Sequence, residues 1–307
     1  MSAYEIFEKH VARAHTLMNV SARVSYDMMC CAARDGADEI AAEQAELEGL
    51  VFDELHCDEY ISALCELRED PSGLDQYQKR LVEVCYRQYE NEKNIPRDFA
   101  VAAAEARQSA YDVWLRAKEA SDFSIFAPAL KKVVEITRAE IDFRDKKYKT
   151  YYDACLADYE FGSSVEKHDA FFEELKKVFP LIASKAASSK KPDPVVRVTI
   201  PEHIQKDMAY ELLALEGLRS SSLSFNLTEH PFTDFYCAGD VRVTSHIYPE
   251  EPMSNVYSVL HEGGHALFMM YMPEVLHKNH LASEPSAAMH ETISRFYENV
   301  IGRSRAF

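Results

Sequence analysis

The most informative segment of this sequence is VYSVLHEGGHALFMM, residues 256–270. Mostly apolar residues on both sides of its polar middle predict a helix. His261 and His265 are four positions apart, so at about 100° per residue they lie about 40° apart on one face. Both imidazoles can then reach one tetrahedral Zn²⁺. Glu262 lies about 100° around the helix from His261, so it is poorly placed to bind the metal but near enough to hold its water.

Two glycines, Gly263 and Gly264, stand in the middle of this predicted helix. Each costs about 1 kcal/mol relative to alanine in a helix interior. The alternative interpretation is a helix that carries two incidental histidines. Because a locally unfavourable residue tends to mark close packing or a site, the glycines favour a functional helix.

A zinc site of this kind needs a third protein ligand and one open position. The downstream candidates are the acidic and imidazole side chains Glu274, His277, His280, Glu284, His290 and Glu291. Glu274 follows Pro273 too closely to fold back. His277 and His280 form an H-x-x-H in a proline-flanked segment, which favours surface histidines. Glu291 opens a strong helical pattern that places Glu298 on the same face, so Glu291 is the geometric favourite.

Composition and charge narrow the function classes. The chain has 307 residues, 47% hydrophobic and 28% charged, as in a globular protein that can bury most of its apolar surface. Its 34 Lys and Arg against 51 Asp and Glu give a formal net charge of -17. That charge repels phosphate backbones and anionic lipid, so we expect no nucleic-acid partner and no membrane partner.

The cysteines and the apolar stretches bear on location. The seven cysteines are scattered and form no C-x-x-C pair, which predicts reduced core thiols in a cytoplasmic protein. Residues 1–20 carry charges inside a helical pattern, unlike a secretory signal, and the apolar stretch 266–273 is too short to span a bilayer. We therefore expect a cytoplasmic location without an anchor.

The first part of the chain is predicted to be helical. From residue 3 to about 189, amphipathic patterns follow one another, with breaks at 35–36, at 70–73, before Pro96 and at 161–164. We predict five to seven long antiparallel helices there. The polar, proline-containing stretch 187–194 is the best candidate boundary. It divides an N-terminal helical region, residues 1–190, from a metal-binding catalytic region, residues 191–307.

The second region combines helices with short strands. Residues 205–218 have a helical pattern, whereas 225–227 and 241–248 are rich in β-branched and aromatic residues and are predicted to be strands. The helical pattern returns at Pro252. The predicted fold class is therefore mainly α, with long antiparallel helices and a small β-sheet beside the H-E-x-x-H helix.

Four motifs of the second half occur in a recognisable order. They are His230-Pro231-Phe232, Asp240-Val241-Arg242-Val243-Thr244, the H-E-x-x-H helix, and the run from His290 to Asn299 with Gly302-Arg303-Ser304. In this order they resemble the H-P-F, D-x-R-x-T, H-E-x-x-H and H-E-[ST]-x-S-R-x-x-E-N…G-R-S motifs of the carboxypeptidase Taq family of zinc metallocarboxypeptidases. The similarity covers the second half well and the helical first half by character. It implies a zincin-like peptidase fold.

The resemblance implies an activity and a set of roles. It implies a metal-dependent carboxypeptidase that releases single C-terminal amino acids from peptides with a free C-terminus. Its ligands would be His261, His265 and Glu291, and Glu262 would be the general base. The cofactor would be one divalent metal, Zn²⁺ first, although a His, His, carboxylate set also accepts Co²⁺ or Mn²⁺.

Three further residues take a predicted role from the resemblance. His230, Asp240 and Arg242 match family motifs, and we expect them near the metal, where they contact the substrate or support the ligands. Metal-bound imidazoles normally donate their other N–H to an oxygen, which gives Asp240 a physical reason to be close. The alternative is that Asp240 and Arg242 pair with each other across a strand turn and that His230 caps a loop.

The resemblance also has a limit. Family members continue past G-R-S with I-R-x-x-A-D and G-x-x-Q-D-x-H-W motifs, whereas this chain stops at Phe307. Those parts are expected to supply an arginine for the substrate's terminal carboxylate. We therefore expect a poor enzyme with an exposed apolar patch at Phe296, Val300 and Ile301 and a tendency to associate. An oligoendopeptidase-like metallopeptidase and a truncated, non-catalytic helical module stay open as alternatives, and so does a homodimer.

Overall fold

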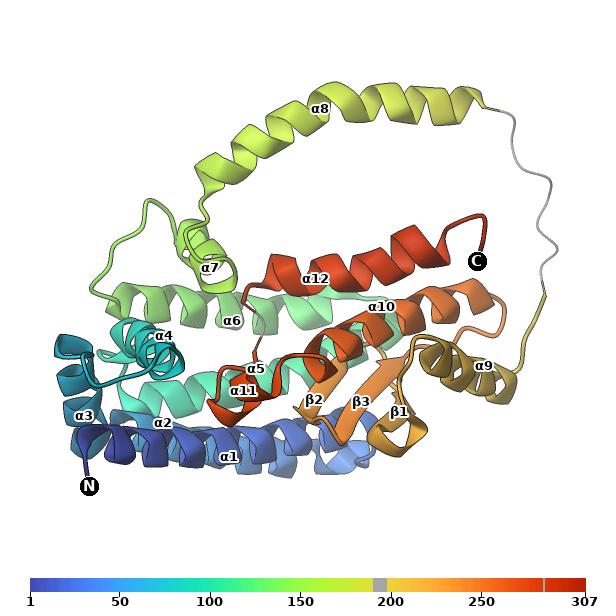
Figure 1. Ribbon diagram of the computed structural model, residues 1–307. Coiled ribbons are helices and arrows are strands. Elements are labelled where there is room, and N and C mark those ends of the chain that lie inside the picture. Colours follow the sequence, from blue (N-terminus) through green and yellow to red (C-terminus); the bar gives the residue numbers. More distant parts are fainter. Residues whose placement is uncertain (190–197, 284) are drawn as a thin grey trace.

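The computed structural model describes residues 1–189, 198–283 and 285–307. The first part is helical: α1 (Ala3–Cys30), η1 (Arg34–Gly36), α2 (Ala37–His56), α3 (Asp58–Glu69), α4 (Gln76–Glu92), α5 (Arg97–Ala120), α6 (Phe123–Phe143), α7 (Tyr151–Tyr159) and α8 (Val165–Ser188). The second part contains α9 (Glu202–Leu215), η2 (Ser220–Ser222), β1 (Leu223–Leu227), β2 (Thr233–Cys237), β3 (Asp240–Ser245), α10 (Pro252–Met270), α11 (Glu274–Lys278), α12 (Ala287–Arg295) and η3 (Phe296–Gly302). The predicted mainly α fold with a small sheet is confirmed (Figure 1).

The predicted breaks between the N-terminal helices are confirmed, but their number was set too low. The described residues before 190 form eight α-helices, because three further breaks, at residue 57, at 121–122 and at 144–150, contain neither Gly nor Pro. Cys57 is extended between α2 and α3. Ser121 ends α5 with a left-handed φ of 51°, a conformation that closes a helix C-terminus.

Polar side chains mark where several helices begin. Ser2 and Glu5 form a capping box at α1, and Asp75 forms one at α4, so backbone N–H groups that lack a helical partner are satisfied. The Ser286 hydroxyl accepts from the Met289 backbone N–H and starts α12. This cap fixes the beginning of the helix that carries Glu291.

The three-stranded sheet has the order β1-β3-β2, with β1 parallel and β2 antiparallel to β3. Its buried side chains pack with α9 and α10 in one core: Ala209, Leu213, Leu218, Phe225, Val241, Val243, Val259, Ala266 and Leu267. Strand β2 was missed in the sequence because Thr233-Asp234-Phe235-Tyr236-Cys237 shows no clean alternation of buried and exposed residues. The sheet supports the H-E-x-x-H helix from below in Figure 1.

The other side of the sheet contacts the first helix. Asn226 Nδ2 donates to Tyr26 Oη at 2.9 Å, and Tyr236 Oη donates to the Ala22 carbonyl at 3.2 Å. Residues 200 and 214 positions apart are thereby joined. The predicted boundary near residue 190 falls on residues 190–197, outside the described ranges, so the division into two regions stays a prediction.

Helix α8 differs from the others in its surface. It has no buried residue, and large apolar side chains on it are exposed: Phe171, Phe172, Leu175, Val178, Phe179, Leu181 and Ile182. Figure 1 shows it arching away from the rest of the chain. Of the apolar patch predicted on the C-terminal helix, Phe296 and Val300 are confirmed as exposed, at 46% and 60%, whereas Ile301 is partly buried.

The structure bears on two features that were used to predict location: the cysteines and the apolar stretches. All seven cysteines are free, as predicted. The prediction that they lie in the core is wrong for most of them: none is fully buried, Cys31 and Cys237 are exposed, and only Cys57 and Cys85 pack against the core of the N-terminal helices. Among the described residues, no helix combines the length and the apolar character needed to cross a membrane.

The approach of α12 and η3 to α10 depends on glycines. A Cβ on Gly264 would lie 2.8 Å from the Cα of Ser294, and a Cβ on Gly302 would lie 2.5 Å from Leu260 Cδ1. Ser294 is fully buried at this contact. The close packing inferred from the mid-helix glycines is therefore confirmed at Gly264.

Gly264→Ala should destabilise the protein by about 1–2 kcal/mol, because the overlap with backbone outweighs the gain in helix propensity. The measurement is the midpoint of urea unfolding. Gly36→Ala is the matched control, since a Cβ there meets nothing within 4 Å. If both substitutions raise the midpoint alike, the close approach at Gly264 does not limit the packing.

Candidate metal centre

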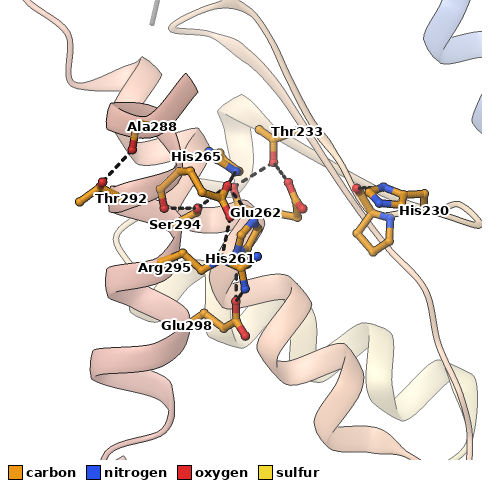
Figure 2. Close-up of polar contacts among 12 residues, drawn as sticks. His230, Thr233, His261, Glu262, His265, Ala288, Thr292, Ser294, Arg295 and Glu298 are labelled. Carbon is orange, nitrogen blue, oxygen red and sulfur yellow. Dashed lines mark hydrogen bonds and ion pairs between the residues drawn. The ribbon is translucent and has the colours of Figure 1, made fainter. Parts of the chain in front are cut away.

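Three side chains from two helices meet at one point. His261 and His265 on α10 face Glu291 on α12, and one ligand atom of each lies within 4.8 Å of the others. Glu291 Oε2 lies 3.6 Å from His261 Nε2 and 3.4 Å from His265 Nε2. Figure 2 shows the His261 and His265 side chains pointing towards the helix that carries Thr292, Ser294 and Arg295. Two imidazole nitrogens and one carboxylate oxygen form a donor set that suits Zn²⁺ and leaves a position open.

His265 is electrically neutral at physiological pH. Burial lowers its pKa to about 4, and the nearby His290 and His261 add to this effect. The rings of His265 and His290 lie 4.2 Å apart, centre to centre. A neutral imidazole keeps the lone pair that a metal requires, so this environment prepares His265 as a ligand.

Glu262 is held on the sheet side of α10. It is 6% exposed, and the Thr233 hydroxyl on β2 lies 2.8 Å from its Oε2. Burial raises the pKa of Glu262 to about 7, the Thr233 hydrogen bond opposes the shift, and the charge of Glu291 adds to it. A carboxyl with a pKa near 7 can both take and release a proton at neutral pH.

Glu298 is a further carboxylate next to the histidines, and no role was assigned to it from the sequence. It lies two turns after Glu291, and its Oε2 is 3.1 Å from His261 Nδ1. Arg295 Nη1 donates to the same oxygen at 2.8 Å, and Arg303 Nη2 donates to Oε1 at 2.8 Å. Helical periodicity predicted Glu298 on the same helix face as Glu291. Only the packing of the two helices shows that Glu298 contacts His261.

Glu216 was also missed, because it lies outside every motif. It follows α9 and takes the space of a side chain at Gly263, where a Cβ would overlap its carboxylate. Both Glu216 oxygens are buried and have no hydrogen-bond partner among the described residues. Burial alone raises the pKa of the Glu216 carboxyl from 4.5 to about 9. The close packing predicted at Gly263 is therefore confirmed, with a buried acid as the neighbour.

Of the three residues carried over from family motifs, only His230 lines the same pocket as His261. His230 lines a pocket of about 350 Å³ together with His261, Glu262, Arg295 and Glu298, although Figure 2 shows it standing apart from them. Its Nδ1 lies 2.8 Å from the Pro231 carbonyl.

Asp240 and Arg242 pair with each other, through Nε to Oδ1 at 3.1 Å and Nη2 to Oδ2 at 3.2 Å. Arg242 also lies over the rings of Tyr26 and Tyr236. These contacts match the pairing that the sequence left open as an alternative. Neither residue belongs to the described lining of the His261 pocket.

None of the remaining ligand candidates in the described residues belongs to the cluster of His261, His265 and Glu291. Glu274 is paired with Lys278 at 2.8 Å, His277 packs on the Phe235 ring, and His280 packs on the His15 ring. His277 belongs to the short α11, which the sequence did not predict. His290 contacts His265 ring to ring, and Glu284 lies outside the described residues.

Comparison with known proteins decides the family. Residues 6–307 match the profile described as carboxypeptidase Taq (M32) metallopeptidase. The chain belongs to the carboxypeptidase Taq (M32) family. The resemblance inferred from the motifs is thereby confirmed over nearly the whole chain, including the helical first half.

Curated relatives and solved structures agree. Carboxypeptidase 1 of Bacillus subtilis is 30% identical over 305 residues, which cover 97% of this chain and 58% of that protein. Thermostable carboxypeptidase 1 of Thermus thermophilus is 29% identical and matches 100% of this chain and 62% of its own length. The crystal structure named BsuCP superposes with a TM-score of 0.94 at 29% identity, covering 98% of this chain and 61% of its own. A carboxypeptidase structure from Pyrococcus furiosus gives 0.85 at 25%, with coverage of 98% and 61%.

Two facts follow from the comparison. The chain spans about three fifths of the length of the relatives it matches, between 58% and 62% for the two above. Membership in a metallopeptidase family implies a divalent metal. The donor set of His261, His265 and Glu291 fits such an ion, because imidazole nitrogens and a carboxylate oxygen are ordinary ligands of divalent metals. It is the one cluster of this kind in the described residues.

Glu216→Gln should change how stability depends on pH. The folded state holds the Glu216 proton more tightly than the unfolded chain, so its contribution is fully present below pH 4.5 and is lost as pH rises towards 9. Relative to the native sequence, the variant should therefore gain about 2–3 kcal/mol between pH 4.5 and pH 7.

The measurement is urea unfolding across that pH range. Glu211→Gln, on the exposed face of α9, is the control and should run parallel to the native protein. Parallel curves for Glu216→Gln as well would show that its carboxyl titrates normally.

Proposed function

We propose that this chain carries the catalytic centre of a metal-dependent carboxypeptidase that releases single C-terminal amino acids from peptides with a free C-terminus. The observation that carries the proposal is the cluster of His261, His265 and Glu291 with Glu262 beside it, in a chain of the carboxypeptidase Taq family. The family match favours this function over an oligoendopeptidase-like peptidase and over a non-catalytic helical module.

In this proposal His261, His265 and Glu291 hold the metal, Zn²⁺ in the first place, with Co²⁺ or Mn²⁺ as substitutes. When bound, such an ion polarises the scissile carbonyl and lowers the pKa of a water molecule. A divalent ion held by two imidazoles and one carboxylate would leave the site with a net positive charge, which favours the developing oxyanion. The low pKa of His265 supports its assignment, because no proton competes for its lone pair at neutral pH.

Glu262 is the proposed general base. Its carboxylate takes a proton from the attacking water and then passes that proton to the leaving amine. The environment supports both steps, since burial raises its pKa to about 7 while the Thr233 hydroxyl keeps its Oε2 in one orientation. His230 is proposed to contact the substrate across the same pocket. Asp240 and Arg242 are proposed to support this region through their contacts with α1 and β2.

The wider context is proposed with the function. We propose a cytoplasmic enzyme, in keeping with seven free and scattered cysteines. Residues 1–190 form a helical region in this proposal, and residues 191–307 form the catalytic region.

His265→Ala should abolish stoichiometric metal binding, because it removes one of three ligands. Metal content per chain, measured after dialysis by mass spectrometry, checks this. His277→Ala is the matched control and should keep the ion, since its ring packs on Phe235 instead. Full retention in His265→Ala would refute the assignment, and loss in His277→Ala with retention in Glu291→Gln would move the third ligand.

Glu262→Gln should keep its metal and lose about 10²-fold or more in the rate of C-terminal release, the scale of positioned acid-base catalysis. The assay compares a peptide with a free carboxylate and the same peptide amidated, with and without chelator. Stepwise shortening of only the free peptide supports the proposal. Internal cuts would indicate an oligopeptidase, and unchanged turnover of Glu262→Gln would refute the role of this carboxylate.

A further inference from the structure

Glu298 is surrounded by donors on both of its oxygens. Oε2 faces His261 Nδ1 at 3.1 Å and Arg295 Nη1 at 2.8 Å, and Oε1 faces Arg303 Nη2 at 2.8 Å. The residue is 8% exposed. Both oxygens of Glu298 are engaged, and the Nε2 of His261 that faces Glu291 is on the far side of the imidazole. Glu298 is therefore placed behind His261, away from the point where His261, His265 and Glu291 meet.

The arrangement follows from two antiparallel helices. On α10, His261 lies about one turn before His265. On the antiparallel segment formed by α12 and η3, Glu298 lies about two turns after Glu291, in the same spatial direction (Figure 1). Glu291 therefore lies between the two imidazoles, and Glu298 lies behind the first. Gly302 permits this, because a Cβ there would meet Leu260, the neighbour of His261.

The two histidines differ on their outer side. His261 Nδ1 has a carboxylate acceptor, whereas His265 Nδ1 is buried and has no hydrogen-bond partner among the described residues. A neutral imidazole carries one proton, and the nitrogen that finds an acceptor keeps it. The environment thus favours the Nδ1 proton at His261. At His265 the nitrogen with a carboxylate nearby is instead Nε2, which lies 3.4 Å from Glu291 Oε2.

We infer that Glu298 is the positioning residue of His261: it accepts the Nδ1 proton and thereby keeps the Nε2 lone pair directed at Glu291, while Arg295 and Arg303 hold Glu298 itself in place. Second-layer carboxylates of this kind change metal affinity by about 10–100-fold when removed. The inference rests on the proposed metal site for its consequence, but the tautomer can be observed without any metal.

A purely structural role for Glu298 makes a different prediction. As the centre of an ion-pair cluster it would attach η3 to α10, so its loss would lower stability and leave the tautomer of His261 unchanged. The two roles are separated by a readout on the imidazole itself.

The experiment uses the whole chain, labelled with ¹⁵N-histidine and free of metal, at pH 7.5. Nitrogen chemical shifts give the ratio of the two tautomers, and His261→Gln identifies the signals of that ring. The native protein should show His261 mainly with its proton on Nδ1. In Glu298→Ala this ratio should fall at least fivefold, while the signals of His265 should keep their positions.

The second measurement is competition for Zn²⁺ with a chelator of known affinity. Glu298→Ala should bind about 10–100-fold more weakly, and Glu298→Gln should lie between it and the native protein, because the amide oxygen still accepts a hydrogen bond. Glu250→Gln, an exposed glutamate before α10, is the control and should match the native protein in both readouts. Far-UV circular dichroism verifies that each variant is folded. If Glu298→Ala does not fold, Glu298→Gln alone is used in both measurements.

The outcomes are distinct. An unchanged tautomer ratio and unchanged Zn²⁺ affinity in a folded Glu298 variant would overturn the inference. If His261→Gln binds Zn²⁺ as tightly as the native protein, the proposed metal site fails, whereas the tautomer ratio of the Glu298 variants still decides the positioning role.

Discussion

The contact on which the site depends is the close approach of α12 to α10 at Gly264. With the Cα of Ser294 lying where a side chain of residue 264 would point, the two helices are nearer than ordinary side chains allow. A carboxylate on one helix can therefore touch imidazoles on the other directly. If a methyl group stood at this position, Glu291 would move away from both histidines, and the donors would no longer share one centre.

Helical periodicity was sufficient to predict the parts of the site that lie on regular helices. The four-residue spacing of His261 and His265, and the pattern beginning near Glu291, depend only on local geometry, and the structure brings these side chains together. Glu298 has the same periodicity, but its partner depends on how two distant helices pack. Glu216 follows α9, and nothing local predicts that it fills the space over Gly263.

The sheet shows a similar limit. The β-branched residues of β1 and β3 predicted strands, whereas β2 is recognised as a strand only by its register with β3. That strand carries Thr233, whose hydroxyl contacts Glu262, so the orientation of the proposed base was not predictable without the structure. Asp240 and Arg242 matched a family motif, yet their side chains pair with each other.

Helix α8 has a consequence for the dynamics of this chain. Its side chains are not buried, so breaking its backbone hydrogen bonds exposes little new apolar surface. Amide protons in such a segment exchange with solvent through local opening, at a free energy well below that of global unfolding. Helix α10, whose inner face is buried against the sheet, exchanges only when the core opens. Hydrogen exchange would therefore divide one chain into a fast outer helix, α8, and a slow inner helix, α10.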